Sequence, residues 1–220
     1  HLSIRRQRQM CIRDRCQVAA EVDAEDYYDF QFTRPSVSFD ESGNRELSWP
    51  GTSFMISSEK DPALSRFSVL IGTEPARRWK AFTAEIIEMI EDREIDAVIF
   101  LGGMLADTPH TRPITVNATS QNEAVRSAMN IERSSYEGPV GILSTLGIAL
   151  EEMGIPTMAL WAAVPHYVHN SPSPKATLAL MAELEKMLGV SFSQGDLADQ
   201  AFEWERGIDE IAENLSLIHI

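Results

Sequence analysis

The chain has 220 residues, of which 44% are hydrophobic and 24% are charged, a balance typical of one globular domain of ordinary size. Its formal net charge of −14 argues against nucleic acid or an anionic membrane as a partner, so we expect neither. The longest apolar runs fall far short of the roughly 18 residues of a membrane span, and we expect a soluble, cytoplasmic protein.

The two ends of the chain match each other through the genetic code. Codons for Leu215–Ile220 can be chosen so that their reverse complement, read one base out of register, encodes Met10–Arg15. Inverted repeats of this kind are typical of adaptor sequence left by library preparation. We therefore interpret 1–15 and 215–220 as adaptor-like, non-native segments and exclude them from fold reasoning. We also expect the native gene to continue at both ends.

The remaining residues, 16–214, are expected to form a single α/β domain. They carry 14 basic and 32 acidic side chains, a net charge of −18, because five arginines of the N-terminal end fall outside them. Cys16 is their one cysteine, which excludes a disulfide framework and a thiolate metal site.

Apolar strand-like runs alternate with amphipathic stretches along most of this domain. Residues 36–39 and 46–49 alternate in polarity around Gly43-Asn44, which predicts a β-hairpin. Apolar residues at helical spacing, with glycine or proline near the ends, indicate the longer helices. The strands expected after the hairpin are 52–56, 67–71, 97–101, 114–118, 138–143 and 156–164, and the expected helices are 75–93, 122–129, 146–153, 174–188 and 195–214.

This alternation predicts a three-layer α/β/α domain with a mostly parallel sheet. In such a sheet the carboxyl ends of the strands share one edge, where ligands bind. The run Ala97–Leu101 is the central strand in this interpretation, because it stops at Gly102 and Gly103 and leads into a polar loop, 102–113. That loop would form one wall of a ligand crevice.

Polar side chains gather in the loops that follow four of the expected strands. They include carboxylates, imidazoles, hydroxyls and an arginine, which are the residue types of an acid–base or anion-binding site. His110 and His166 are the catalytic candidates. The binding candidates are Glu74, Gly102, Gly103, Asp107, Arg112, Ser144, Thr145 and Tyr167.

Each candidate also has a structural alternative. Arg112 either holds an anionic ligand or braces its loop through an ion pair with Asp107 or Glu74. His110 and His166 either transfer protons or serve as hydrogen-bonded loop residues. No cofactor or metal is expected, because the paired glycines lack the spacing of a phosphate loop and no local histidine pair has the spacing of metal ligands.

The order of these motifs resembles the proteasome assembly chaperone 2 family, and its bacterial members in particular. The resemblance rests on Gly72-Thr-Glu-Pro75 with Trp79 after it, on Pro109-His-Thr-Arg-Pro113, on 141–147 and on Val164-Pro-His-Tyr167, within a span of about 23–214. It implies an α/β/α fold similar to the nucleoside phosphorylase/hydrolase type, and self-association. Family members usually begin with a further strand–helix unit, so the resemblance also implies that this chain lacks its first unit.

The bacterial members of that family have no settled activity. We expect a non-catalytic, homo-oligomeric binding or assembly protein, with proteasome subunits or a small anionic ligand as further partners. The alternative is an enzyme acting on a small anionic or nucleotide-like substrate, with Arg112 holding the anion and His110 or His166 in acid–base work. Some members are described as ATP-dependent carboligases, but this sequence has no recognisable nucleotide-phosphate loop and no carboxylate–Asn pair for Mg²⁺.

Overall fold

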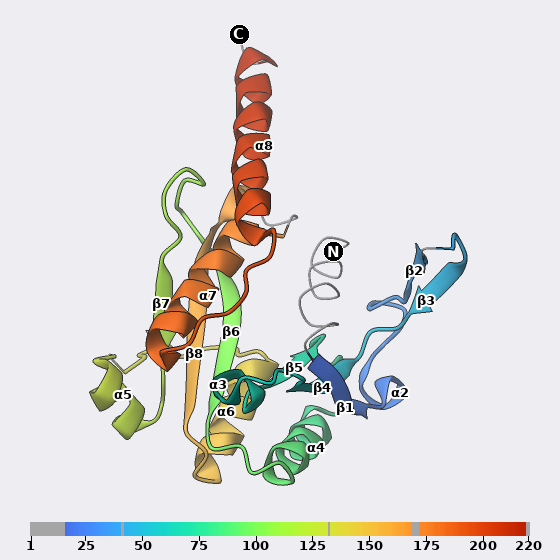
Figure 1. Cartoon of the computed structure of the whole chain (residues 1–220), viewed down its shortest axis with the longest axis vertical. Helices are drawn as coiled ribbons and strands as arrows, with labels where there is room; N and C mark the ends of the chain where they lie inside the picture. The colour runs from blue at the N-terminus through green and yellow to red at the C-terminus, as the bar shows by residue number, and fades with distance from the viewer. Residues whose placement is uncertain (1–15, 41, 132, 169–171, 219–220) are drawn as a thin grey trace. The chain divides into compact units, whose positions relative to one another are not determined.

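The computed structural model describes residues 16–40, 42–131, 133–168 and 172–218, with side chains up to 210 (Figure 1). The adaptor-like segment 1–15 and the last two residues of 215–220 lie outside the described residues. The described chain divides into two compact units, one built from residues up to 98 together with 135–156, the other from 99–134 and 157 onward. Within these ranges no helix is long and apolar enough to cross a membrane.

The unit that contains residues up to 98 is built around a three-stranded antiparallel sheet. Its strands are β1 (Cys16–Val22), β4 (Thr52–Ser57) and β5 (Ser68–Gly72), in the order β1-β4-β5. The expected strands 52–56 and 67–71 are therefore confirmed. The connection 58–67, which holds the one-turn helix α3 (Pro62–Ser65), is shorter than the dozen or so residues that a parallel crossover needs, so β5 returns antiparallel.

Two helices supply most of the apolar core of this unit. They are α4 (Trp79–Glu91) and α6 (Ile142–Glu152), which pack against each other. Their buried side chains recur at helical spacing, as the amphipathic pattern of the sequence requires. The fully or almost fully buried residues of the unit include Tyr27, Tyr28, Phe54, Phe82, Ile86, Ile90, Leu146 and Leu150.

A β-hairpin and a one-turn helix complete this unit. The short helix α2 (Ala24–Tyr27) follows β1, and the hairpin pairs β2 (Ser36–Phe39) with β3 (Arg45–Ser48) as an antiparallel two-stranded sheet. The turn is fixed by Asp40, whose carboxylate accepts from the backbone N–H groups of Ser42 and Asn44. The hairpin expected from the alternating sequence is confirmed.

The other unit is built around the sheet order β6-β8-β7. Its strands are β6 (Val98–Ala106), β8 (Thr157–Pro165) and β7 (Val116–Thr119), and β7 runs antiparallel to β8. Alternate residues of β8, namely Met158, Leu160 and Ala162, are buried. Helix α7 (Pro174–Leu188) packs on β8 and on α8 (Leu197–Ile218), and α5 (Glu123–Met129) follows β7 (Figure 1).

The expectation of a mostly parallel sheet is wrong. The described strands form three small sheets, and all four pairings whose register is described are antiparallel. The sequence-based interpretation took each strand–helix alternation as a parallel crossover, whereas short returns and the hairpin produce antiparallel neighbours. The coarser prediction of a mixed α/β protein is confirmed.

Two helix starts also differ from expectation. The segment 138–143 is not a strand: helix α6 already begins at Ile142, with Gly141 as its N-cap, so Ser144 and Thr145 lie inside the first turn and do not cap it. Helix α4 begins at Trp79 and not near Pro75, because the backbone N–H groups of Ala76 and Arg77 donate to the carbonyl of Tyr27 and hold that segment outside the helix.

Candidate functional site around His110 and Tyr167

The structure brings two of the predicted site residues into direct contact, His110 and Tyr167. His110 lies in the loop after β6 and is 8% exposed, while Tyr167 lies in the 3₁₀ turn η1 (His166–Val168) that follows β8. The tyrosine hydroxyl is 2.7 Å from the backbone N and 2.8 Å from Nδ1 of His110. The two rings meet edge to face, with their centroids 5.9 Å apart.

A carboxylate holds the other side of the imidazole. Nε2 of His110 lies 2.8 Å from Oδ1 of Asp209 on α8. The Tyr167 hydroxyl accepts the His110 backbone N–H, so in the neutral imidazole its own proton is directed to Nδ1. Nε2 then carries the ring proton and donates it to Asp209. Both ring nitrogens of His110 are therefore engaged in one hydrogen-bonded chain.

A lysine–glutamate pair supports the same loop from the helices. Nζ of Lys175, in the first turn of α7, donates to the His110 carbonyl oxygen and to Oε2 of Glu205, each at 2.6 Å. Glu205 and Asp209 are four residues apart on α8 and thus face the loop from one side of that helix. The Lys175 side chain is 18% exposed, so this ion pair is partly shielded from water.

This arrangement combines the elements of a proton relay with those of a structural brace. A phenol, an imidazole and a carboxylate in series are groups that serve in general acid–base catalysis. Here the His110 ring is buried and its hydrogen-bonding capacity is filled by the protein. A substrate would have to displace Tyr167 or Asp209 to reach a ring nitrogen, which favours the structural alternative for His110.

The other predicted residues of this unit occupy more varied positions. Gly102 and Gly103 lie within β6, so the strand does not stop at the glycines as expected, and the loop begins only at Asp107. Asp107 and Arg112 are exposed, and the described ion pairs do not include the alternative pairing of Arg112 with Asp107 or Glu74. His166 is exposed, and its ring meets that of Tyr167 edge to face at 5.5 Å.

The three remaining candidates lie in the unit with α6. Glu74 Oε1 accepts a hydrogen bond of 2.8 Å from the backbone N of Ile142, at the first turn of α6. Gly141 provides no side-chain cap, so Glu74 supplies the missing acceptor, and its negative charge suits the helix N-terminus. Ser144 and Thr145 lie next to this contact. The convergence of all ten candidates on one crevice stays a prediction.

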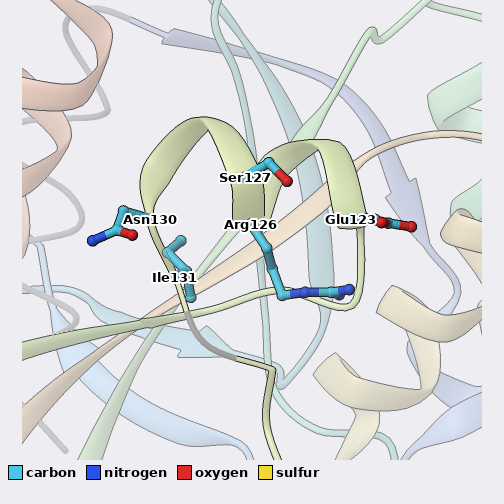
Figure 2. A pocket seen from close by; sticks show the side chains of 5 residues that line it. All are labelled: Glu123, Arg126, Ser127, Asn130 and Ile131. Carbon is cyan, nitrogen blue, oxygen red and sulfur yellow. The ribbon is translucent and has the colours of Figure 1, made fainter.

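A shallow cavity of about 420 Å³ lies at α5, and none of the predicted site residues lines it (Figure 2). Its lining residues are Glu123, Arg126, Ser127, Asn130 and Ile131. Arg126 donates to the backbone carbonyls of Ser120 and Gln121, so its guanidinium stabilises the approach to the helix. Within the described part of the chain no group of three or more His, Cys, Asp and Glu side chains has the arrangement of a metal site.

Comparison with known proteins places these features in a family. The sequence profile of the PAC2 family matches residues 14–212. The chain belongs to the PAC2 family. A crystal structure of a PAC2 family protein from Streptomyces avermitilis is 39% identical with a TM-score of 0.79, and the match covers 90% of this chain and 84% of that one. The family resemblance of the sequence motifs is thereby confirmed.

Two further solved structures show how widely the PAC2 fold is shared. The Mycobacterium tuberculosis proteasome-assembly chaperone homologue is 39% identical, with a TM-score of 0.74 over 89% of this chain and 82% of that one. PbaA of Pyrococcus furiosus, an archaeal homologue of proteasome-assembly chaperone, is 18% identical with a TM-score of 0.56 over 86% and 80% of the two chains, which shows the fold alone. Among proteins with curated descriptions, none matches this PAC2 chain.

Sequence reasoning missed three members of the His110 cluster in this PAC2 protein: Lys175, Glu205 and Asp209. One signal for them was present. Lys175 directly follows Pro174 in the first turn of α7, where the helix dipole disfavours a cation. A lysine at such a position needs a nearby anion, and Glu205 supplies it. The partners themselves come from a helix about 30 residues further on, which no local pattern reveals.

Proposed function

We propose that this PAC2 protein is a non-catalytic, homo-oligomeric binding or assembly protein of the cytoplasm, with proteasome subunits as its partners. The observation that carries the proposal is the state of His110. Its two ring nitrogens are partnered by Tyr167 and Asp209, and its carbonyl by Lys175, while His110 itself is 8% exposed. One of the two acid–base candidates of the chain thus fastens a loop to α7 and α8.

The names of similar proteins support the same proposal. The M. tuberculosis relative, at 39% identity, is described as a proteasome-assembly chaperone homologue. An assembly role needs a stable surface more than a reactive centre, and the loop around His110 is held by its contacts with Tyr167, Lys175 and Asp209. The three-layer α/β/α arrangement remains part of the proposal, without the mostly parallel sheet.

The proposal is tested by reconstituting a proteasome with and without this protein. Proteasome α and β subunits from the same genome are mixed with the purified chain, and the products are followed by native mass spectrometry. We expect a transient complex with one subunit type and a higher yield of assembled particles. Unchanged yield with no complex at any stage would overturn the assembly role.

One observation favours the enzyme alternative, namely the exposure of Arg112. It lies two residues after His110 and forms no described ion pair, so its guanidinium is available to a small anion such as a phosphate. A thermal-shift series with ATP, nucleosides and inorganic phosphate tests the enzyme alternative. No stabilisation by any of them would count against it.

A pair of arginine variants makes the thermal-shift test specific. Arg112→Gln removes the candidate anion contact, and Arg66→Gln removes another exposed arginine, which follows α3, and serves as the control. Stabilisation by a nucleotide or phosphate that is lost in R112Q and retained in R66Q would establish Arg112 as an anion contact, which the enzyme alternative requires. Equal behaviour of both variants would exclude Arg112 as the ligand contact.

A further inference from the structure

The hairpin of β2 and β3 separates apolar from polar side chains. Val37 lies opposite Leu47 in the antiparallel register, and Phe39 lies opposite Arg45. Because side chains alternate along a strand, these four share one face of the hairpin, and Trp49, two residues after Leu47, continues it. The opposite face carries Ser36, Ser38, Glu46 and Ser48.

The apolar face, defined as Val37, Phe39, Leu47 and Trp49, is exposed. These side chains are 46%, 71%, 51% and 53% exposed, respectively. The described sheet has two strands only, and Figure 1 shows it projecting from the β1-β4-β5 sheet of the same unit. Among the described ring contacts, Trp49 is the one residue of this face with an aromatic neighbour, Phe30, and the ring centroids are 4.8 Å apart. A two-stranded hairpin of this kind is marginally stable without a covering layer.

The chemistry of this face suits a second copy of the same chain. Its core is formed by aromatic and aliphatic residues with Arg45 beside them, and no carboxylate lies on it, although the chain has 33 acidic residues against 19 basic ones. Most surfaces of two such copies repel each other, so contact is favoured at a patch without acidic groups. The same face on a second copy can also pack against it under a two-fold axis.

The exposed area agrees with a reversible dimer. Given the exposed fractions and the usual areas of such side chains, the apolar face offers roughly 350 Å² on each copy, or about 700 Å² for two. Interface cores are about 65% apolar, which implies an interface of roughly 1,100 Å². This lies near the lower end of the range for specific complexes and indicates association that depends on concentration.

We propose that the hairpin docks its apolar face on the same face of a second copy of this chain. The inference rests on the homo-oligomeric part of the proposed function and names the surface that carries it. Each copy covers Phe39 and Leu47 of the other, and this contact supplies the covering layer that the two-stranded sheet lacks.

The test uses two variants of the hairpin in the full chain. Leu47→Glu places a charge on the apolar face, and Ser38→Glu places the same charge on the opposite face of the same hairpin as a matched control. Both positions are exposed, so both variants should fold, and circular dichroism with thermal melts verifies this. Sedimentation velocity then measures the dimer dissociation constant across protein concentration.

We expect a wild-type dimer with a dissociation constant in the micromolar range, weakened about tenfold or more in L47E and within about twofold of wild type in S38E. A wild-type chain that stays monomeric up to about 200 µM would overturn the proposal. A dimer that is equally stable in L47E would also overturn it. The same holds for a monomer in which another part of the same chain protects the β2 and β3 amides from hydrogen exchange.

The reconstitution experiment separates this inference from the proposed function. If particle assembly is promoted while L47E and wild type are both monomeric, the docking proposal fails and the assembly role stands. If the dimer forms as expected but the protein does not bind proteasome subunits, the assembly role fails and the docking surface stands. If the wild type is monomeric and binds proteasome subunits, and L47E does not bind them, the apolar face binds a client protein. That outcome would overturn the second copy as its occupant.

Discussion

The ring of Trp161 on β8 occupies the space that a side chain at Gly102 on β6 would need. A Cβ built on Gly102 would lie 2.3 Å from Cζ3 of Trp161, well inside contact distance. The glycine therefore permits close approach of a large aromatic ring from the neighbouring strand. Its role in β6 is structural, and the exposed loop begins several residues later.

Gly102→Ala is expected to lower the free energy of unfolding by about 1–3 kcal/mol, because the added methyl group forces the Trp161 ring or the strand to move. Gly103→Ala is the matched control. Its Cβ would lie 3.4 Å from Cγ2 of Val164, so we expect a change within about 0.5 kcal/mol. Urea denaturation of both variants measures the difference, and equal losses would contradict the packing argument.

Tyr167→Phe is expected to destabilise the protein by about 1–3 kcal/mol, because it leaves the backbone N–H and Nδ1 of buried His110 without their partner. Tyr136→Phe serves as the comparison. The Tyr136 hydroxyl donates to the carbonyl of Pro139 at an exposed site. Water can replace the hydroxyl there, so the free energy of unfolding is expected to change by no more than about 0.5 kcal/mol. Chemical denaturation that ranks the two variants in the opposite order would refute the bracing role of Tyr167.

The local elements of this fold follow from the sequence more closely than its assembly does. The hairpin, the buried strand β8 and the helix α7 with Gly189 at its end obey patterns of two or 3.6 residues that short windows contain. Strand direction depends on the length and path of connections, which composition does not encode. The mostly parallel sheet was therefore the expectation that failed.

In the candidate site, too, local features follow from the sequence and long-range contacts do not. The sequence predicts His110 and Tyr167 as site residues because both lie in loops that follow expected strands, and the structure joins them. Asp209 and Lys175 complete the cluster from two helices, at sequence separations of 99 and 65 residues from His110. Long-range contacts of this kind are set by packing, so the sequence alone did not indicate which carboxylate would face the imidazole.

Glu74→Ala is expected to cost about 1 kcal/mol of stability, because it removes the only acceptor described for the backbone N–H of Ile142 at the start of α6. Glu74→Gln keeps an acceptor oxygen without the charge and should recover part of that loss, which separates hydrogen bonding from the helix-dipole effect. Thermal unfolding at low and high salt measures both. If the alanine and glutamine variants match wild type, Glu74 is not a functional cap.

Tyr27 provides a prediction about high pH. Its hydroxyl donates a 2.6 Å hydrogen bond to Oε2 of Glu85, and this bond, together with burial and the glutamate charge, raises the pKa of Tyr27 from 10.0 to about 12. The folded state therefore binds the phenolic proton more tightly than the unfolded chain. The stability that results is fully present below pH 10 and is lost as the pH rises through about 12.

Ultraviolet titration of the phenolate band tests the Tyr27 shift. We expect the difference between the titration curves of wild type and Tyr27→Phe to show one group that ionises near pH 12. The difference in the free energy of unfolding between the two proteins should shrink between pH 10 and 12. Glu85→Gln keeps a side-chain acceptor and removes the charge, so in this variant Tyr27 should ionise at lower pH than in wild type. A Tyr27 transition near pH 10 in the folded wild-type protein would contradict the contact with Glu85.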